Sequence, residues 1–323
     1  MSELINVNDL VVKFRKKSSR IFDLKPEYFN ANDHVSFSIN KGETFGLVGE
    51  SGSGKSTIGK TILGYNRPSS GQILYEGCDL HSLKPRELKP YQKKMQSVFQ
   101  DPYSSLDPSM TVREIISEPM DIHGICTGSA RERRIAELLE AVGMDADDMK
   151  KYPYEFSGGQ KQRISIARAL SVDPEFIVCD EPISALDVSL QAQIVFLLQK
   201  IQKEKGLTYL FISHQLQVVE KICDRIGVLY LGSIMETGTS DEVCVHPAHP
   251  YTQMLMASIL EPDPRVHSLD HVTNDSGDQV HAENCCKFCN RCPYASERCR
   301  KEIPPLTEIT PGHKVACFKS FLS

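Results

Sequence analysis

The chain has 323 residues, 40% of them apolar, so it is long enough to bury one large core and a smaller appendage. Its formal net charge of −5 provides neither a basic surface for nucleic acid nor an acidic tail. No apolar run approaches the ~20 residues that span a bilayer, and the N-terminus lacks the pattern of a signal peptide. We therefore expect a soluble protein that could act at a membrane only through partner chains.

Apolar and amphipathic segments alternate along the chain, which favours an α/β fold. Short apolar runs at Thr44–Val48, 176–179 and 209–212 are bounded by glycine or polar residues, as strands buried in a parallel sheet are. Residues 57–63 favour a helix. Residues 131–142 place apolar side chains at i, i+3, i+4 and i+7, which predicts an amphipathic helix.

A glycine-rich loop joins the first of these strands to the first of these helices. Gly49-Glu-Ser-Gly-Ser-Gly-Lys-Ser56 fits G-x-x-x-x-G-K-[ST], whose backbone N–H groups bind phosphate oxygens beside a helix N-terminus. Lys55 can reach the β- and γ-phosphates, and the Ser56 hydroxyl can ligate Mg²⁺. A chance glycine-rich turn is the alternative, and the strand–loop–helix setting argues against it. The residues expected to bind nucleotide here are Gly49, Glu50, Ser51, Gly52, Ser53, Gly54, Lys55, Ser56 and Thr57.

Two acids end the apolar run at 176–179. Asp180 can hold Mg²⁺, through water, and Glu181 can orient and polarise an attacking water. Phosphoryl transfer requires mainly positioning and charge neutralisation from the protein, so one acid for the metal and one for water suits hydrolysis. A strand that merely exits into solvent is the alternative, which the nearby phosphate loop disfavours.

A second candidate anion site lies at Phe156-Ser-Gly-Gly-Gln160. It precedes a predicted helix at 162–169, with Ser157 well placed as the N-cap, and its glycines leave the helix N-terminus open to an anion. An ATPase needs two such sites if each subunit caps the γ-phosphate held by a partner. The segment resembles the ABC signature, in which leucine usually occupies the position of Phe156.

The resemblance to ABC ATPases covers residues 4–250, and its motifs occur in the expected order. It implies a core like that of RecA, an antiparallel β subdomain and a helical subdomain at about 101–165, together forming an ATPase domain over residues 1–252. It implies that Gln100, after a strand at 97–99, senses the γ-phosphate and lies near Mg²⁺. It implies that Asp187 belongs to a loop crossing a dimer interface and that His214 is the switch histidine.

Three sets of site residues follow from this resemblance. The catalytic set is Glu181, His214, Gln100 and Lys55, and the Mg²⁺ set is Ser56, Gln100 and Asp180. The residues that would cap the partner's ATP are Ser157, Gly158, Gly159 and Gln160. An aromatic ring of the N-terminal hairpin should stack on adenine; Phe14 is our choice, and Phe22, Tyr28 and Phe29 compete because an insertion at 16–27 obscures the register.

Three further segments resemble the peptide/nickel importer family of ATP-binding subunits. They are the stretch 100–112, the sequence His249-Pro-Tyr-Thr252, and the cysteine-rich tail. The resemblance implies two such subunits, identical or paralogous, at the cytoplasmic face of the cell membrane. They would lie beneath two permeases served by an external binding protein. Oligopeptides or dipeptides are the expected cargo, with nickel, glutathione or oligosaccharide as alternatives.

The tail, residues 253–323, begins with a predicted linker and holds six of the eleven cysteines: Cys285, Cys286, Cys289, Cys292, Cys299 and Cys317. In a chain without an export signal, such a cluster indicates a metal site or free thiols. The resemblance selects Cys286, Cys292, Cys299 and Cys317 as ligands of a [4Fe-4S] cluster, with Cys289 possible. Zinc and free thiols stay open as alternatives.

Other classes of ABC ATPase fit less well. A DNA-repair ATPase would carry a long coiled coil between its phosphate loop and signature, where this chain has about a hundred residues and no heptad pattern. A translation factor would carry two cassettes in one chain. A non-enzymatic metal-binding module would leave the ATPase motifs unexplained.

Overall fold

The computed structural model describes residues 2–15, 27–101, 105–257 and 284–319. A four-stranded antiparallel sheet has the order β2-β1-β4-β5. Its strands are β1 (Glu3–Arg15), β2 (Tyr28–Asn40), β4 (Ser70–Tyr75) and β5 (Cys78–Asp79). The expected antiparallel β subdomain is therefore present. The predicted insertion at 16–27, Phe22 and the predicted linker lie outside the described residues, except for Glu27.

An eight-stranded sheet with the order β11-β12-β10-β9-β3-β8-β7-β6 forms the centre of the molecule. Its parallel part is β6 (Met95–Val98), β7 (Phe176–Asp180), β8 (Thr208–Ile212), β3 (Thr44–Val48) and β9 (Arg225–Tyr230). The antiparallel strands β10 (Ser233–Thr239), β12 (His313–Val315) and β11 (Thr307–Thr310) extend one edge. Every residue of β3, β7 and β8 is buried, as their continuous apolar runs predicted.

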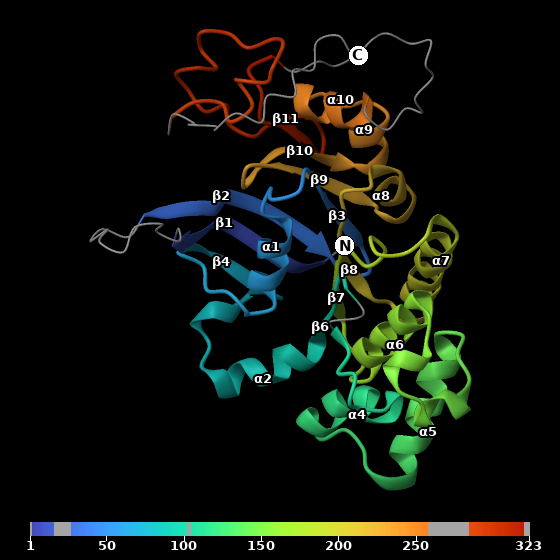
Figure 1. Ribbon diagram of the computed structural model, residues 1–323. Helices are drawn as coiled ribbons and strands as arrows, with labels where there is room; N and C mark the ends of the chain where they lie inside the picture. The colour runs from blue at the N-terminus through green and yellow to red at the C-terminus, as the bar shows by residue number, and fades with distance from the viewer. Residues whose placement is uncertain (1, 16–26, 102–104, 258–283, 320–323) are drawn as a thin grey trace, which may run out of the picture.

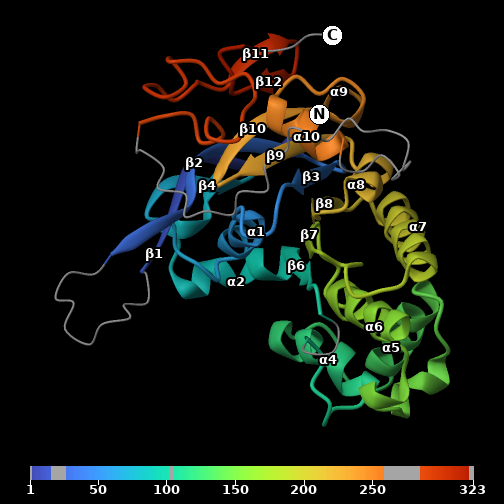
Figure 2. The same ribbon diagram turned by 45° about the horizontal axis from the view of Figure 1, so that its top comes forward.

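The described helices divide between the central sheet and a separate lobe (Figure 1). Figure 2 shows α4 (Val112–His123), α5 (Gly128–Ala141) and α6 (Gly158–Leu170) gathered in that lobe, with α6 in contact with strand β6 of the central sheet. The predicted helix at 162–169 begins earlier, at Gly158, because the Ser157 hydroxyl accepts a hydrogen bond from the Gln160 N–H. The remaining α-helices are α1 (Lys55–Ile62), α2 (Pro85–Lys94), α7 (Val188–Lys205), α8 (Leu216–Ile222), α9 (Ser240–Cys244) and α10 (Pro250–Ala257).

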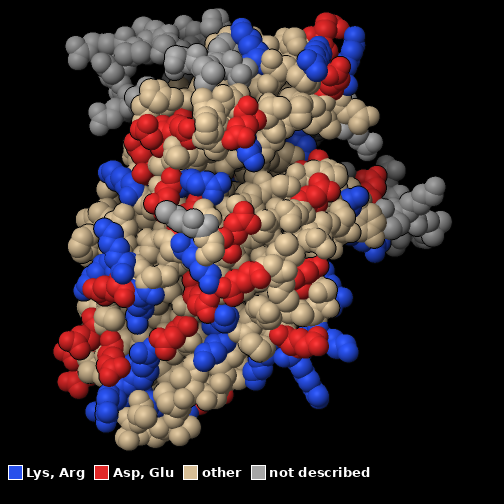
Figure 3. Space-filling view, turned by 180° about the vertical axis from the view of Figure 1, so that it is seen from behind, with Lys and Arg blue, Asp and Glu red and all other residues tan. Residues whose placement is uncertain are grey.

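Acidic and basic side chains are interspersed over the face of the molecule shown in Figure 3. This face carries no broad region of a single sign, in agreement with the small net charge. Among the described residues, no helix has the length and apolar character needed to cross a membrane.

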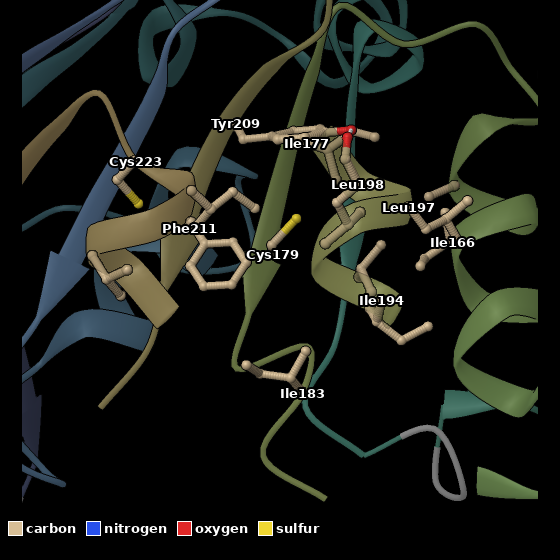
Figure 4. Packing of buried hydrophobic residues seen from close by; sticks show 14 of the residues in the cluster. Ile166, Ile177, Cys179, Ile183, Ile194, Leu197, Leu198, Tyr209, Phe211 and Cys223 are labelled. Carbon is tan, nitrogen blue, oxygen red and sulfur yellow. Dashed lines mark hydrogen bonds between the residues drawn. The ribbon is translucent and has the colours of Figure 1, made fainter. Parts of the chain in front are cut away.

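Helix α7 connects the central sheet to the helical lobe through apolar side chains (Figure 4). Ile194, Leu197 and Leu198 of α7 lie between the strand residue Cys179 and Ile166 of α6, and all of these side chains are buried. The sheet edge that ends in the predicted acids is therefore packed, through one helix, against the lobe that carries the predicted signature.

The C-terminal region continues the central sheet. Strand β12 pairs with β10, with Glu236 opposite Val315, and Phe288 packs its ring against Tyr230 and Tyr251 at centroid distances of 5.4 Å. The Glu236 carboxylate is fully buried and accepts hydrogen bonds from the N–H groups of Ala248 and His249, both at 2.9 Å. Its oxygen Oε1 also lies 2.7 Å from Nε2 of His313.

Replacing His313 by leucine should destabilise the protein, because it removes one partner of a buried carboxylate and leaves that group under-satisfied. We expect a loss of about 2–4 kcal/mol in the free energy of unfolding and a Tm lower by about 5 °C or more. Urea and thermal denaturation would measure both. Lys314→Gln, on the exposed face of the same strand, is the control; equal stability of the two variants would contradict the role assigned to His313.

Candidate nucleotide site

The phosphate loop lies between β3 and α1, and two of its glycines are required by neighbouring backbone. A Cβ on Gly54 would lie 2.2 Å from the Ala31 carbonyl oxygen, and one on Gly49 would lie 2.1 Å from that of Leu229. Gly54 also has a φ of 101°, which side-chain-bearing residues rarely adopt. The Asn32 side chain donates to the Gly54 carbonyl at 3.1 Å. The loop is thus held from behind by the antiparallel sheet.

The Lys55 side chain is buried beneath this loop. Its Nζ donates to the carbonyl oxygens of Gly49 and Glu50, both at 2.8 Å. Burial is the main cause that lowers the pKa of Lys55, and the carboxylates of Glu181 and Asp180 oppose that shift. The positive charge of Lys55 therefore lies directly under the loop amides that would surround a phosphate.

Hard oxygen ligands meet where α1 begins. The Ser56 hydroxyl donates to Oδ1 of Asp180 at 2.7 Å, although the two residues lie 124 positions apart. Burial raises the pKa of Asp180, and the hydrogen bond from Ser56 opposes the rise. A hydroxyl beside a buried carboxylate fits Mg²⁺, which prefers oxygen ligands and keeps several waters.

Glu181 and His214 lie together at the ends of neighbouring strands. Oε1 of Glu181 is 3.3 Å from Nδ1 of His214. The Glu181 backbone has a φ of 49°, and its N–H donates to the Ile212 carbonyl at 2.9 Å. A non-glycine residue held in the left-handed region is strained, and such strain is often found at functional sites.

A cavity of about 760 Å³ connects these groups. It is lined by Phe14, Phe29, Asn30, Ala31, Ser51, Gly52, Gly54, Lys55, Ser56, Thr57, Gln100, Glu181, His214, Leu231 and Gly232. Ten of the predicted nucleotide-binding and catalytic residues therefore surround one space. The predicted residues Gly49, Glu50, Ser53 and Asp180 lie outside this lining, and Asp180 reaches it through Ser56.

Sequence reasoning missed four residues of the lining: Asn30, Ala31, Leu231 and Gly232. Gly232 lies at the turn between β9 and β10, and its N–H donates to the Ser53 carbonyl at 2.9 Å. The glycine between two apolar runs predicts a hairpin turn. Its approach to the phosphate loop depends on a contact across 179 positions, which no local pattern contains.

The candidate signature and the loop at Asp187 do not line this cavity. Ser157 caps α6, and the N–H of Ser157 donates to the Gln160 side chain at 2.9 Å. Asp187 caps α7 by accepting the Leu190 N–H at 3.0 Å. The N-terminus of the signature helix is therefore separate from the chain's own phosphate loop.

The predicted [4Fe-4S] cluster in the tail is wrong. All six tail cysteines lie within the described range 284–319, and no three Cys, His, Asp or Glu side chains of the described residues converge as metal ligands do. Instead, the Cys317 thiol donates to the Lys319 carbonyl at 3.0 Å, and Cys299 Sγ lies 3.2 Å from the Ser296 hydroxyl. Burial raises the pKa values of Cys286, Cys289 and Cys292 in this structure. The same geometry gives no support for zinc.

A phosphate loop after β3, two acids at the end of β7 and a separate signature helix define a P-loop ATPase of the ABC class. Comparison with protein families agrees. A family described as "ABC transporter" matches residues 32–184, and one described as "Oligopeptide/dipeptide transporter, C-terminal region" matches residues 235–299. The chain belongs to the ATP-binding subunits of ABC transporters of the oligopeptide/dipeptide type, which bind and hydrolyse ATP with Mg²⁺.

Relatives at high identity extend over nearly the whole chain. It is 52% identical to YkfD of Bacillus subtilis over 297 residues, which cover 91% of this chain and 90% of YkfD. It is 47% identical to the oligopeptide transport ATP-binding protein OppF of Streptococcus mutans, over 97% of this chain and 94% of OppF.

Solved structures resemble the ATPase part of the fold. The dimeric cassette MJ0796 with bound ADP and phosphate has a TM-score of 0.65 at 28% identity, covering 73% of this chain and 99% of the cassette. CbiO1 of Clostridium perfringens, part of a transporter complex, has a TM-score of 0.65 at 25% identity, covering 82% and 97%. These likenesses confirm the predicted ABC ATPase fold.

The tail thiols should react slowly in the folded protein. Burial raises the pKa of Cys286 to about 12, so at pH 8 we expect iodoacetamide to alkylate it at least about 100-fold more slowly than in the urea-unfolded chain. Between about pH 9 and 12 the unfolded chain loses this proton first, so the free energy of unfolding should fall as pH rises. Peptide mapping by mass spectrometry gives the rates, with the less buried Cys78 as reference. Equal rates at Cys286 and Cys78 would contradict this account.

Proposed function

We propose that the chain is one of two ATPase subunits that power the import of oligopeptides or dipeptides. The observation that carries the proposal is that the chain joins an ATPase site to a C-terminal region of the oligopeptide/dipeptide transporter type. Relatives named for oligopeptide transport support the cargo. Two membrane permeases and an external binding protein would complete the importer, and the permeases would hold the chain at the cytoplasmic face of the membrane.

In the proposed mechanism, Glu181 acts as the general base that orients and polarises the attacking water. His214, 3.3 Å from Glu181, holds that carboxylate and contacts the γ-phosphate. Lys55 and Gln100 contact the γ-phosphate from the loop side. Mg²⁺, held by Ser56 and Gln100 and by Asp180 through water, would neutralise phosphate charge.

We propose that two copies, or this chain and a paralogue, complete each other's sites. Ser157, Gly158, Gly159 and Gln160 would cap the ATP on the partner's loop, with Asp187 at the interface between the subunits. Their position outside the chain's own cavity supports this arrangement, and so does the dimeric form of MJ0796. Closure around ATP would move the helical lobe and transmit the change to the permeases through the segment after Gln100.

The proposed functions fall in successive segments of the chain. Residues 1–252 form the ATPase, with a helical subdomain at about 101–165, and residues 253–323 form the C-terminal extension. Phe14 is the proposed adenine platform. Phe14 and Phe29 both line the cavity, with ring centroids 6.1 Å apart, whereas Tyr28 does not line it.

Replacing Glu181 by glutamine tests the mechanism and the function together. The isosteric amide cannot accept a proton, so we expect ATP binding to persist while ATP turnover falls about 100-fold or more. Uptake of a labelled peptide by cells that carry only this variant should stop. Fluorescent-nucleotide binding, phosphate release and uptake are the measurements.

Glu204→Gln, which changes an exposed carboxylate on α7 outside the cavity, is a control for general charge loss and should retain ATP binding and hydrolysis. Steady rapid hydrolysis by Glu181→Gln would remove Glu181 from the role of base. Normal peptide uptake without ATP turnover, or selective loss of the uptake of another solute, would contradict peptide import.

Replacing Phe14 by alanine should weaken ATP binding, because base stacking on an aromatic ring contributes about 1–3 kcal/mol. We expect about a tenfold higher Kd for ATP and a similar loss for GTP, since stacking discriminates little between bases. Titration of the full chain with fluorescent nucleotide measures this. Tyr28→Ala should leave the Kd unchanged. A larger rise in Kd for Phe29→Ala than for Phe14→Ala would show instead that Phe29 stacks on adenine.

A further inference from the structure

Glu50, the second residue of the phosphate loop, is held at each of its polar groups. Its backbone N–H donates to the Tyr251 hydroxyl at 3.0 Å, and its carbonyl accepts from Lys55 Nζ at 2.8 Å and from the Ser53 N–H at 3.2 Å. Its carboxylate pairs with Arg291 through two hydrogen bonds, Nη1 to Oε2 and Nη2 to Oε1, both at 2.9 Å. Two of these four partners lie far along the chain, at α10 and in the cysteine-rich tail.

Tyr251 is a rigid support for this loop. Its side chain is fully buried, and its ring lies 4.6 Å from that of Tyr230 and 5.4 Å from that of Phe288. Its own N–H donates to Nδ1 of His249 at 3.0 Å. The His249-Pro-Tyr-Thr252 segment thus has a physical role that its resemblance alone did not give: it turns a tyrosine hydroxyl toward the loop backbone.

Several contacts also fix the position of Arg291. Its guanidinium lies over the rings of Tyr230 and Phe288, at 5.7 and 5.8 Å from their centroids, and its backbone N–H donates to the Phe288 carbonyl at 3.1 Å. Only 23% of the Arg291 side chain and 39% of the Glu50 side chain are exposed. A bidentate arginine–carboxylate pair fixes the direction as well as the distance between its partners, which a lysine cannot do.

We propose that Arg291 is a positioning residue for ATP binding: the C-terminal extension holds the phosphate loop in its binding shape through Glu50. When ATP draws Lys55 from the loop carbonyls to its phosphates, Glu50 loses one of its four hydrogen-bonding partners. Tyr251, Arg291 and the Ser53 N–H remain, so the loop amides keep their orientation. This inference rests on the assignment of ATP to the phosphate loop, and it gives the tail a role in nucleotide affinity that requires no metal.

A simpler account is that Arg291 only fastens the extension to the rest of the protein. Other contacts already do so without touching the phosphate loop itself. The buried His313–Glu236 contact joins β12 to β10, and Lys287 Nζ pairs with Asp33 at 2.8 Å. The two accounts differ in what a loss of Arg291 changes: ATP affinity if it positions the loop, and only stability if it fastens the extension.

The test compares variants of the full chain by their Kd for Mg-ATP, from fluorescent-nucleotide titration, and by their Tm. Arg291→Gln should raise the Kd about three- to tenfold, as expected for a half-buried bidentate pair, with little change in Tm. Arg291→Lys should restore part of the affinity. Glu50→Gln should raise the Kd similarly, and adding Arg291→Gln to it should change little more, because both act through one contact.

Two matched controls separate positioning from fastening. His313→Leu loosens the extension away from the loop, so it should lower the Tm and leave the Kd within about twofold. Lys301→Gln removes a positive charge whose partner, Glu297, lies in the same exposed segment, and it should change neither value.

An unchanged Kd in Arg291→Gln would overturn the proposal. So would an equal rise in Kd in His313→Leu, or losses that multiply in the Glu50→Gln and Arg291→Gln double variant. Failure of the unsubstituted chain to bind ATP would instead overturn the proposed function itself, and the inference with it.

Discussion

The parallel pairing of β3, β8 and β7 is the constraint on which the nucleotide site depends. Leu47 and Asp180 both lie opposite Ile212, so the three strands end at the same edge of the sheet. The phosphate loop, the two acids and His214 each lie at the end of one of these strands or within two residues after it. Since every residue of these strands is buried, a slip in their register would force side chains on both faces of the sheet to repack. The core therefore fixes distances between groups that lie more than a hundred residues apart.

The parts of the fold that the sequence predicted are those whose causes are local. A continuous apolar run predicts a buried strand, and a glycine-rich loop followed by Lys-Ser predicts a phosphate site, without knowledge of distant residues. The strand at Thr44–Val48 has the predicted bounds, and α6 begins only a few residues early because its serine cap acts before the apolar pattern starts. Gly232 and Arg291 could not be found in this way, since each reaches the loop across many residues.

The cysteine tail shows the opposite case, in which a local pattern was specific and the prediction was still wrong. Spacing indicates which thiols could ligate a metal, but ligation requires them to converge on one point as thiolates. In the described structure the tail sulfur atoms that make polar contacts face a carbonyl, a hydroxyl, an amide or one another, and no three ligand side chains converge. The choice between Phe14 and Phe29 has a similar origin. The strands that carry both rings pair directly, with Phe14 opposite Phe29, so composition alone does not distinguish them.

The C-terminal extension and the ATPase share one hydrophobic core, so the tail is packed as part of the ATPase and not as a separate appendage. Strand β12 adds to the central sheet, Phe288 packs beside Tyr230 and Tyr251, and the hydroxyl of Tyr251 reaches the backbone of the phosphate loop. Any movement of the extension relative to β10 must therefore disturb either a buried carboxylate or the loop itself. The signature helix, which begins at Gly158, lies by contrast in the separate lobe, and its residues do not line this cavity. The extension therefore reaches the chain's own phosphate loop, whereas the N-terminus of the signature helix is separate from that loop and, in the arrangement we propose, would cap the ATP of a partner subunit.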